Sequence, residues 1–221
     1  MDWQALRLSL ELAAGTLAVL LPPGLWLARW LASTRFAGKG WVEALVVLPL
    51  VLPPTVLGYY LLVSLGGASP VGRWVNDTFG VRLTFNFFGL LLASIVFNVP
   101  FLVQPVQRAF EAIPRQLGEA AAVSGLSAWQ TFWRVELPLA WPGVLSAMVL
   151  TFVHTLGEFG VVLMIGGSIP GETKTIAISI YDRVQAFDLA SANRMALLLL
   201  VFSLVAVGAS FFAAARVARR R

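Results

Sequence analysis

Long apolar stretches separated by short polar segments are the main pattern of this sequence. A membrane-spanning helix needs about 20 mostly apolar residues. Five stretches reach that length, and they are residues 8–27, 41–65, 85–106, 139–165 and 195–215. The segments between them hold most of the charged residues. The pattern therefore predicts an all-α integral membrane protein in which residues 1–221 form a single transmembrane domain.

Prolines interrupt several of these stretches, and they are densest in the sequence Leu-Pro-Leu-Val-Leu-Pro-Pro at 48–54. Proline has no backbone N–H and tends to kink a helix. Inside a membrane, the carbonyl groups that lose a partner must be satisfied by neighbouring helices or by water. We therefore predict irregular backbone close to a transport pathway at 48–54. For the other prolines, kinks that serve only helix packing are an equal alternative.

The composition supports a membrane protein, because 58% of the residues are hydrophobic and only 12% are charged. A soluble domain carries about 25% charged residues. The chain has no cysteine, which excludes disulfides and thiolate metal sites, and its one histidine, His154, excludes a multi-histidine metal centre within a single chain. The net charge of +5 is spread between the apolar stretches. This distribution favours a role in membrane topology over nucleic-acid binding.

The distribution of lysine and arginine predicts the orientation. With the N-terminus outside, the segments on the inner side hold ten basic residues and those on the outer side hold six. The positive-inside rule then favours an outside N-terminus and an inside C-terminus. We interpret the first apolar stretch as a retained span and not a cleaved leader, because it continues past Pro22 and further spans follow.

The most informative polar segment is 111–138, on the predicted inner side. Pro114 is suited to the first turn of a helix, and small and apolar residues then recur at helical spacing. Arg115 and Glu119, four residues apart, are placed to form an ion pair on the exposed side. Gly125 marks a point where the chain turns back. An ordinary amphipathic helix lying on the membrane is the alternative interpretation.

This segment resembles the signature of importer-type ABC permeases, which is Glu-Ala-Ala, three residues, Gly, nine residues, Ile, one residue and Leu-Pro. Val135 in place of isoleucine is the one departure. The corresponding positions here are Glu119, Ala120, Ala121, Gly125, Val135, Leu137 and Pro138. In that family the segment is a coupling helix that sits in a groove of an ATP-hydrolysing subunit.

The resemblance implies a mechanism and a set of partners. Glu119 and Gly125 are expected to be the main anchors on a cytoplasmic ABC ATPase dimer, whose closure drives alternating access. This chain has no Gly-x-x-x-x-Gly-Lys-Ser/Thr phosphate loop. We therefore expect a non-catalytic subunit without a cofactor of its own, with ATP bound by the partner. Five spans enclose too small a bundle for a large cavity, so a homodimer is expected.

Along nearly its full length the chain is similar to molybdate permease subunits of type I ABC importers. The similar pieces are residues 36–39, 48–54, 58–59, 156–160 and 169–176. The resemblance implies a five-span core in the bacterial cytoplasmic (inner) membrane that imports molybdate, and possibly tungstate, from an extracytoplasmic binding protein. Related sulfate permeases share the Gly-Glu-Phe-Gly piece at 157–160, so permeases for sulfate, thiosulfate or tungstate remain alternatives.

The pathway residues are less sharply indicated. No predicted span carries lysine or arginine in its interior, which fits weak, transient contacts with a dianion because a buried cation would slow its release. A conducting channel is equally compatible. Glu158 would repel an anion, so we expect it to pair helices or shape a gate, and we expect His154 to bond between helices. The candidate pathway or gate residues are Pro53, Pro54, Thr155, Gly157, Glu158 and Gly160.

Two other classes fit less well. An ion-coupled secondary transporter needs intramembrane ionisable residues or inverted repeats, and the chain offers only His154 and Glu158, with no visible repeat. A membrane enzyme is disfavoured because no nucleophile and base are evident together. The outer loop 168–194 is the natural docking surface for a binding protein.

Overall fold

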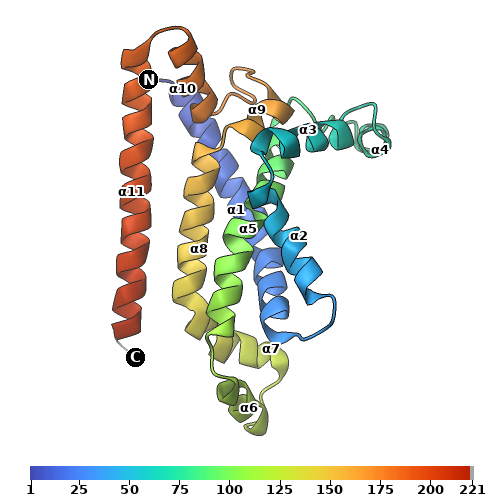
Figure 1. Cartoon of the computed structure of the whole chain (residues 1–221), viewed down its shortest axis with the longest axis vertical. Coiled ribbons are helices and arrows are strands. Elements are labelled where there is room, and N and C mark those ends of the chain that lie inside the picture. The colour runs from blue at the N-terminus through green and yellow to red at the C-terminus, as the bar shows by residue number, and fades with distance from the viewer. Residues whose placement is uncertain (220–221) are drawn as a thin grey trace.

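The computed structural model describes residues 1–219 as an elongated bundle of helices, with no β-strand among those residues (Figure 1). Arg220 and Arg221, which were counted in the predicted inner tail, lie outside the described residues. The N-terminus lies near one end of the bundle, and the last described residues lie near the other (Figure 1). The bundle therefore has two distinct ends, each with its own set of loops.

Three long helices form the centre of the bundle. The helix α5 (Phe87–Glu111) packs against both α1 (Trp3–Ser33) and α8 (Leu137–Gly157). Helices in membranes approach closely where small residues face each other. Such residues recur at this core, where Ala28 of α1 and Ala140 and Ala147 of α8 are buried with the larger side chains of α5.

The predicted span 41–65 is divided into α2 (Lys39–Val51) and α3 (Pro54–Leu65), which meet at an angle of 107°. Leu52 and Pro53 between them have extended backbone conformations. Pro53 and Pro54 supply no amide hydrogens, so the hydrogen-bond pattern of α2 cannot continue through them. The irregular backbone predicted for 48–54 is therefore present, as a sharp bend. The short helix α4 (Pro70–Phe79) follows at the same end of the bundle (Figure 1).

The predicted span 139–165 is also interrupted. The helix α8 ends at Gly157, Glu158 is extended, and a separate short helix, α9 (Gly160–Gly166), packs against α3. The side chains of α3 and α9 form a second apolar cluster with the first part of α5 and the N-terminal part of α1. The bend in the second span and the break in the fourth therefore come together at one end of the bundle.

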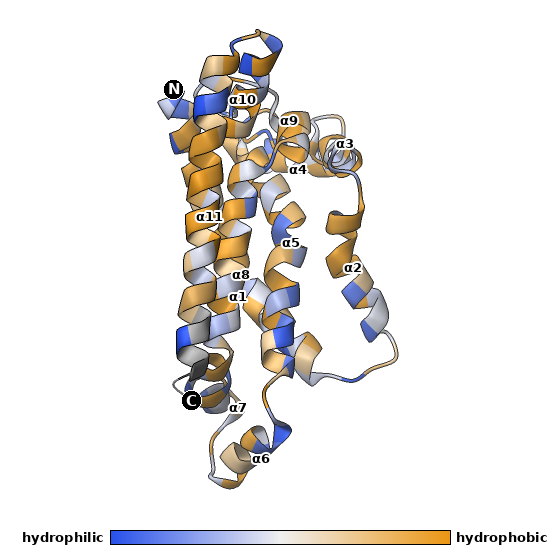
Figure 2. Ribbon diagram, turned by 60° about the vertical axis from the view of Figure 1, so that its left-hand side comes forward, coloured by the Kyte–Doolittle hydropathy of each residue, from blue (hydrophilic) through white to orange (hydrophobic). Residues whose placement is uncertain are grey.

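The last helices lie to one side. The helix α10 (Ile176–Gln185) leads to α11 (Leu189–Arg219), which packs against α8 and α10 (Figure 1). Figure 2 shows apolar residues along much of α11, and most of its large apolar side chains are exposed. Among the described residues, four helices are long and apolar enough to cross a membrane, and a fifth span is counted if α2 and α3 act as one.

Candidate functional site

The segment that follows α5, residues 112–136, forms a lobe at one end of the bundle (Figure 1). Its first helix is α6 (Arg115–Val123), which starts directly after Pro114. It packs against α7 (Ala128–Thr131) and against the π-helical turn η1 (Phe132–Glu136). The helix predicted after Pro114 is confirmed, and α6 lies at the tip of the lobe in both Figures 1 and 2.

A glycine turn ends α6. Gly125 has a φ of +77°, in the left-handed region that favours glycine. The Leu126 N–H donates to the carbonyl oxygen of Ala121, five residues back, at 3.0 Å. This is the 6→1 hydrogen bond of a Schellman motif, which commonly ends a helix at a glycine. The reversal predicted at Gly125 is confirmed. Ser127 is the N-cap of α7 and forms a capping box. The Ser127 side chain accepts a hydrogen bond from Gln130 N–H, and the Gln130 side chain accepts one from Ser127 N–H.

The helix α7 runs through η1 into α8 without a gap. Leu137 N–H donates to the Phe132 carbonyl oxygen, five residues back. Pro138, the last residue of the signature, has no amide hydrogen, so the ordinary i→i−4 pattern is broken there. Single π-helical turns are frequent at functional sites. Here the turn joins the lobe to a membrane helix.

The lobe exposes several residues of the signature. Glu119, Ala120 and Gly125 are exposed, whereas Ala121 is buried. The predicted ion pair between Arg115 and Glu119 is not formed in the described structure, which leaves the Glu119 carboxylate free. Apolar side chains surround these groups, and Val123 is 90% exposed. Leu137 is half-buried and Pro138 exposed, at the start of α8.

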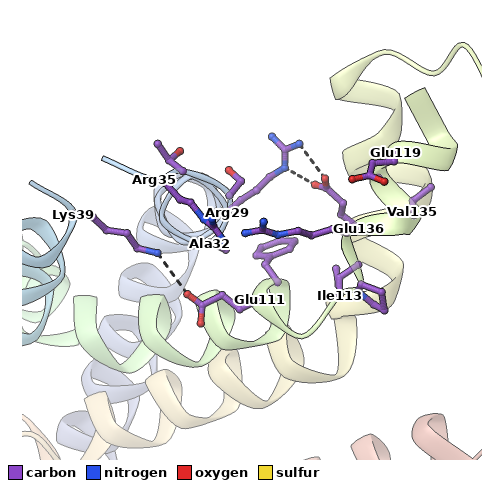
Figure 3. A pocket seen from close by; sticks show the side chains of 15 residues that line it. Arg29, Ala32, Arg35, Lys39, Glu111, Ile113, Glu119, Val135 and Glu136 are labelled. Atoms are coloured by element: carbon purple, nitrogen blue, oxygen red, sulfur yellow. Dashed lines mark hydrogen bonds and ion pairs between the residues drawn. The ribbon is translucent and has the colours of Figure 1, made fainter. Parts of the chain in front are cut away.

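A cavity of about 810 Å³ lies between the lobe and the ends of α1 and α5 (Figure 3). It has four basic and three acidic lining side chains, which are Arg29, Arg35, Lys39 and Arg115 with Glu111, Glu119 and Glu136. Its walls come from the end of α1, the start of α2, the end of α5, and from α6 and η1. The cavity separates the tip of the lobe from the helix bundle.

Ion pairs cross this cavity (Figure 3). Lys39 Nζ, at the start of α2, lies 3.8 Å from Glu111 Oε1 at the end of α5 and 3.6 Å from Glu43 Oε1. Gln107 Nε2 donates to Glu43 and to Glu111 at 2.7 and 2.9 Å. These contacts fasten the start of α2 to the end of α5. A second pair joins Arg29 of α1 to Glu136 of η1.

The structure brings some of the candidate pathway residues together. Pro54, at the start of α3, lies against Gly160 at the start of α9, where an added Cβ would be 2.7 Å from Pro54 Cβ. Pro53 is exposed beside it, and Gly157 is exposed with open space around its Cα. Thr155 is buried and donates to the Thr151 carbonyl oxygen at 2.8 Å, so its hydroxyl serves its own helix.

Glu158 is 5% exposed and lies beside α5. Its Oε2 accepts from Ser94 Oγ at 3.3 Å, and its Oε1 is buried with no partner among the described residues. One turn away, His154 Nδ1 lies 3.0 Å from Asn98 Oδ1, which confirms the predicted helix-to-helix contact of the histidine. Ser94 and Asn98 of α5 thus form a polar line with His154 and Glu158 at the facing end of α8. This arrangement agrees with a helix-pairing role for Glu158.

Sequence reasoning missed Ser94 and Asn98 as members of this line. Their spacing of four within an apolar span was the available signal, because it places them on one helix face. Among residues 1–219, no three histidine or acidic side chains gather in a way that would hold a metal ion. The site therefore consists of an exposed lobe at one end of the bundle and a buried row of polar groups between α5 and α8.

Comparisons with known proteins identify the family. Residues 21–221 match the model described as "Binding-protein-dependent transport system inner membrane component". The chain is 48% identical to the molybdenum transport system permease protein ModB of Azotobacter vinelandii over 95% of this chain and 93% of the relative. It is 38% identical to the Escherichia coli K12 protein of the same name, over 83% and 80% of the two chains.

The sulfate transport system permease protein CysT of Escherichia coli K12 is 35% identical over 82% of this chain and 65% of the relative. Among solved structures, a bacterial ABC transporter for import of the acidic polysaccharide alginate superposes with a TM-score of 0.78 at 20% identity, over 96% and 78% of the two chains. At that identity the likeness shows the fold alone.

Proposed function

Because this chain belongs to the family of binding-protein-dependent transport system inner membrane components, we propose that it is the membrane-spanning permease of an ATP-driven molybdate importer. It is a multi-pass protein of the bacterial inner membrane. The observation that carries the proposal is the lobe α6–η1, which holds the Glu119-Ala120-Ala121 and Gly125 pattern at its tip, with the Glu119 carboxylate free for a partner.

Molybdate is the substrate favoured by the relatives. Those named for molybdenum transport are more similar to this chain, and over more of their own length, than the one named for sulfate. The polar line between α5 and α8 contains no lysine or arginine. The line therefore offers no cation that would bind a dianion tightly and slow its release. Tungstate has the same shape and charge, so it is the first competitor to test.

The mechanism is alternating access driven from outside the chain. Two copies of the permease enclose the pathway, and a cytoplasmic ABC ATPase dimer, which binds ATP, holds one lobe in each subunit. Closure of the ATPases draws the lobes together and turns the cavity from inward- to outward-facing. The permease contributes no catalytic residue and no cofactor to hydrolysis.

The proposed topology has five spans, with α2 and α3 counted as one, an outside N-terminus and an inside C-terminus. The excess of basic residues in the proposed inner segments supports it. The lobe, the end of α1 and the start of α2 lie at the same end of the bundle (Figure 1). Membrane lipid surrounds the exposed apolar sides of the spans.

The proposed docking surface for the extracytoplasmic binding protein is the segment 168–194 at the other end, predicted as a loop, which contains α10 and the start of α11. Lys174 Nζ lies 2.7 Å from Asp182 Oδ2 within this segment. Ser179 Oγ donates to Asp2 Oδ2 at 2.8 Å and Ile176 N–H donates to Ser9 Oγ of α1 at 2.8 Å, so the segment is held against the start of α1. Burial alone would raise the pKa of Asp2. The pKa nevertheless lies below its ordinary value, because the carboxylate accepts hydrogen bonds from Ala5 and Ser179. The positive charges of Lys174 and Arg183 nearby lower it further.

The substrate is tested by uptake of labelled molybdate into vesicles that contain the permease, its ATPase and its binding protein. We expect ATP-dependent uptake that excess tungstate inhibits and excess sulfate leaves nearly unchanged. Uptake of labelled sulfate under the same conditions, without uptake of labelled molybdate, would assign the protein to sulfate transport.

The partner surface is tested with Glu119→Ala, with Gln116→Ala on the same exposed helix as the matched control. Loss of a charged anchor at a protein interface is expected to weaken binding by at least about tenfold. The measurement is the affinity of the purified ATPase for the permease in nanodiscs. Equal affinities of the two variants would remove Glu119 from the proposed interface.

A further inference from the structure

Glu136, at the end of η1, forms a bidentate ion pair with Arg29 of α1 (Figure 3). Arg29 Nε donates to Glu136 Oε2 at 2.5 Å, and Arg29 Nη2 donates to Glu136 Oε1 at 3.3 Å. The arginine and glutamate side chains are 32% and 23% exposed. Bidentate arginine–carboxylate pairs fix geometry as well as charge, and partial burial protects them from screening by salt. This contact therefore sets the position of Glu136 relative to α1.

The same guanidinium group also reaches the other end of η1. Arg29 Cζ lies 5.3 Å from the centre of the Phe132 ring, within the range of a cation–π contact. Phe132 is the first residue of η1 and Glu136 the last. One side chain of α1 therefore holds both ends of the π-helical turn that joins the lobe to α8.

The pair differs from the other ion pairs near the lobe. Arg108 and Glu111 are three residues apart on one helix, and the Arg108 side chain is 81% exposed. Arg29 and Glu136 are separated by 107 residues of sequence. Among the described ionisable side chains of 115–136, Glu136 alone forms an ion pair with a membrane helix. It is thus the one charged connection from the lobe to a helix other than α8.

We propose that Arg29 and Glu136 are positioning residues that couple the lobe to α1. A π-helical turn has weaker hydrogen bonding than an α-helix and would absorb a displacement of α6 by rearranging. With both ends of η1 held by Arg29, the displacement moves α1 together with α8, and α5 packs between them. The inference rests on the proposed function, in which an ATPase moves the lobe.

The test is the ratio of molybdate taken up to ATP hydrolysed by the reconstituted complex with its binding protein. Arg29→Glu and Glu136→Arg are each expected to lower this ratio by about tenfold, and the double exchange is expected to restore most of it. Exchange of the Arg7 and Glu11 charges, an exposed pair in the other half of α1, is the matched control and leaves the ratio unchanged. A purely structural pair would lower uptake and hydrolysis together.

Hydrogen exchange on the same complex tests the connection without any substrate. Amides of 132–140 are expected to exchange faster in Glu136→Gln, which keeps the shape and removes the charge, and to regain protection in the double exchange. The inference is overturned if the single variants change neither the hydrogen exchange of 132–140 nor the ratio of uptake to hydrolysis. It is also overturned if the double variant restores neither quantity. If the unaltered complex imports no oxyanion, the proposed function fails, while the exchange data still decide whether Arg29 holds η1.

Discussion

At the residue scale, Glu158 is a buried acidic residue beside α5. Its carboxylate is buried, accepts one hydrogen bond from Ser94 and leaves Oε1 without a partner. Burial without full hydrogen bonding disfavours the ionised form of a carboxyl group. Any negative charge at Glu158 is therefore expected to destabilise the fold.

Replacing Glu158 by glutamine tests whether a charge at this position stabilises the fold. The amide keeps the volume and still accepts from Ser94, so we expect the thermal midpoint of the purified permease to stay equal or rise. Ser94→Ala is the control that removes the hydrogen bond and keeps the charge, and it lowers the midpoint. A fall in the midpoint of Glu158→Gln would show that the charge stabilises the fold.

The contact between Gly160 and Pro54 gives a second residue-scale prediction. An added methyl group at Gly160 meets the rigid proline ring at 2.7 Å, whereas at Gly157 it meets nothing within 4 Å. Over-packing of this kind typically costs about 1–3 kcal/mol. Gly160→Ala is therefore expected to lower the thermal midpoint clearly, and Gly157→Ala to leave it nearly unchanged. The same midpoint in both variants would contradict the close approach of α3 and α9.

At the element scale, α6 depends on its glycine end. Alanine at Gly125 must adopt a φ near +77°, which costs roughly 1–2 kcal/mol for a residue with a Cβ. Gly118 lies inside α6 with open space around its Cα, so alanine there stabilises the helix by up to about 1 kcal/mol. Hydrogen exchange of 117–126 is expected to be faster in Gly125→Ala and slower in Gly118→Ala. Equal rates would show that the turn at Gly125 has no such requirement.

The sequence predicted the long elements well, because apolar length and proline position act locally. The spans at the start, middle and end of the chain, the helix after Pro114 and the turn at Gly125 all followed from such signals. The break after Gly157 did not, because the apolar pattern continues through it and Glu158 is extended without a proline. The contact between Arg29 and Glu136 joins residues 107 positions apart, which no local pattern reports.

At the scale of the whole molecule, the two ends of the bundle have different tasks. One end carries the lobe and a cavity rich in ion pairs, and the other carries the bend between α2 and α3, the break after α8 and the segment 168–194 held against the start of α1. The helices between them are packed through small residues, which suits rigid elements that move as units. The account therefore requires that the lobe faces the cytoplasm and contacts the ATPase.

Labelling of single cysteines tests this requirement most directly, because the natural chain contains none. Val123 at the end of α6 and Phe187 between α10 and α11 are 90% and 89% exposed. A membrane-impermeant thiol reagent is expected to label Val123→Cys only in inside-out vesicles, with protection when the ATPase is bound, and to label Phe187→Cys only in right-side-out vesicles. Labelling of Val123→Cys from the outside, or from the inside without any protection by the ATPase, would contradict the account.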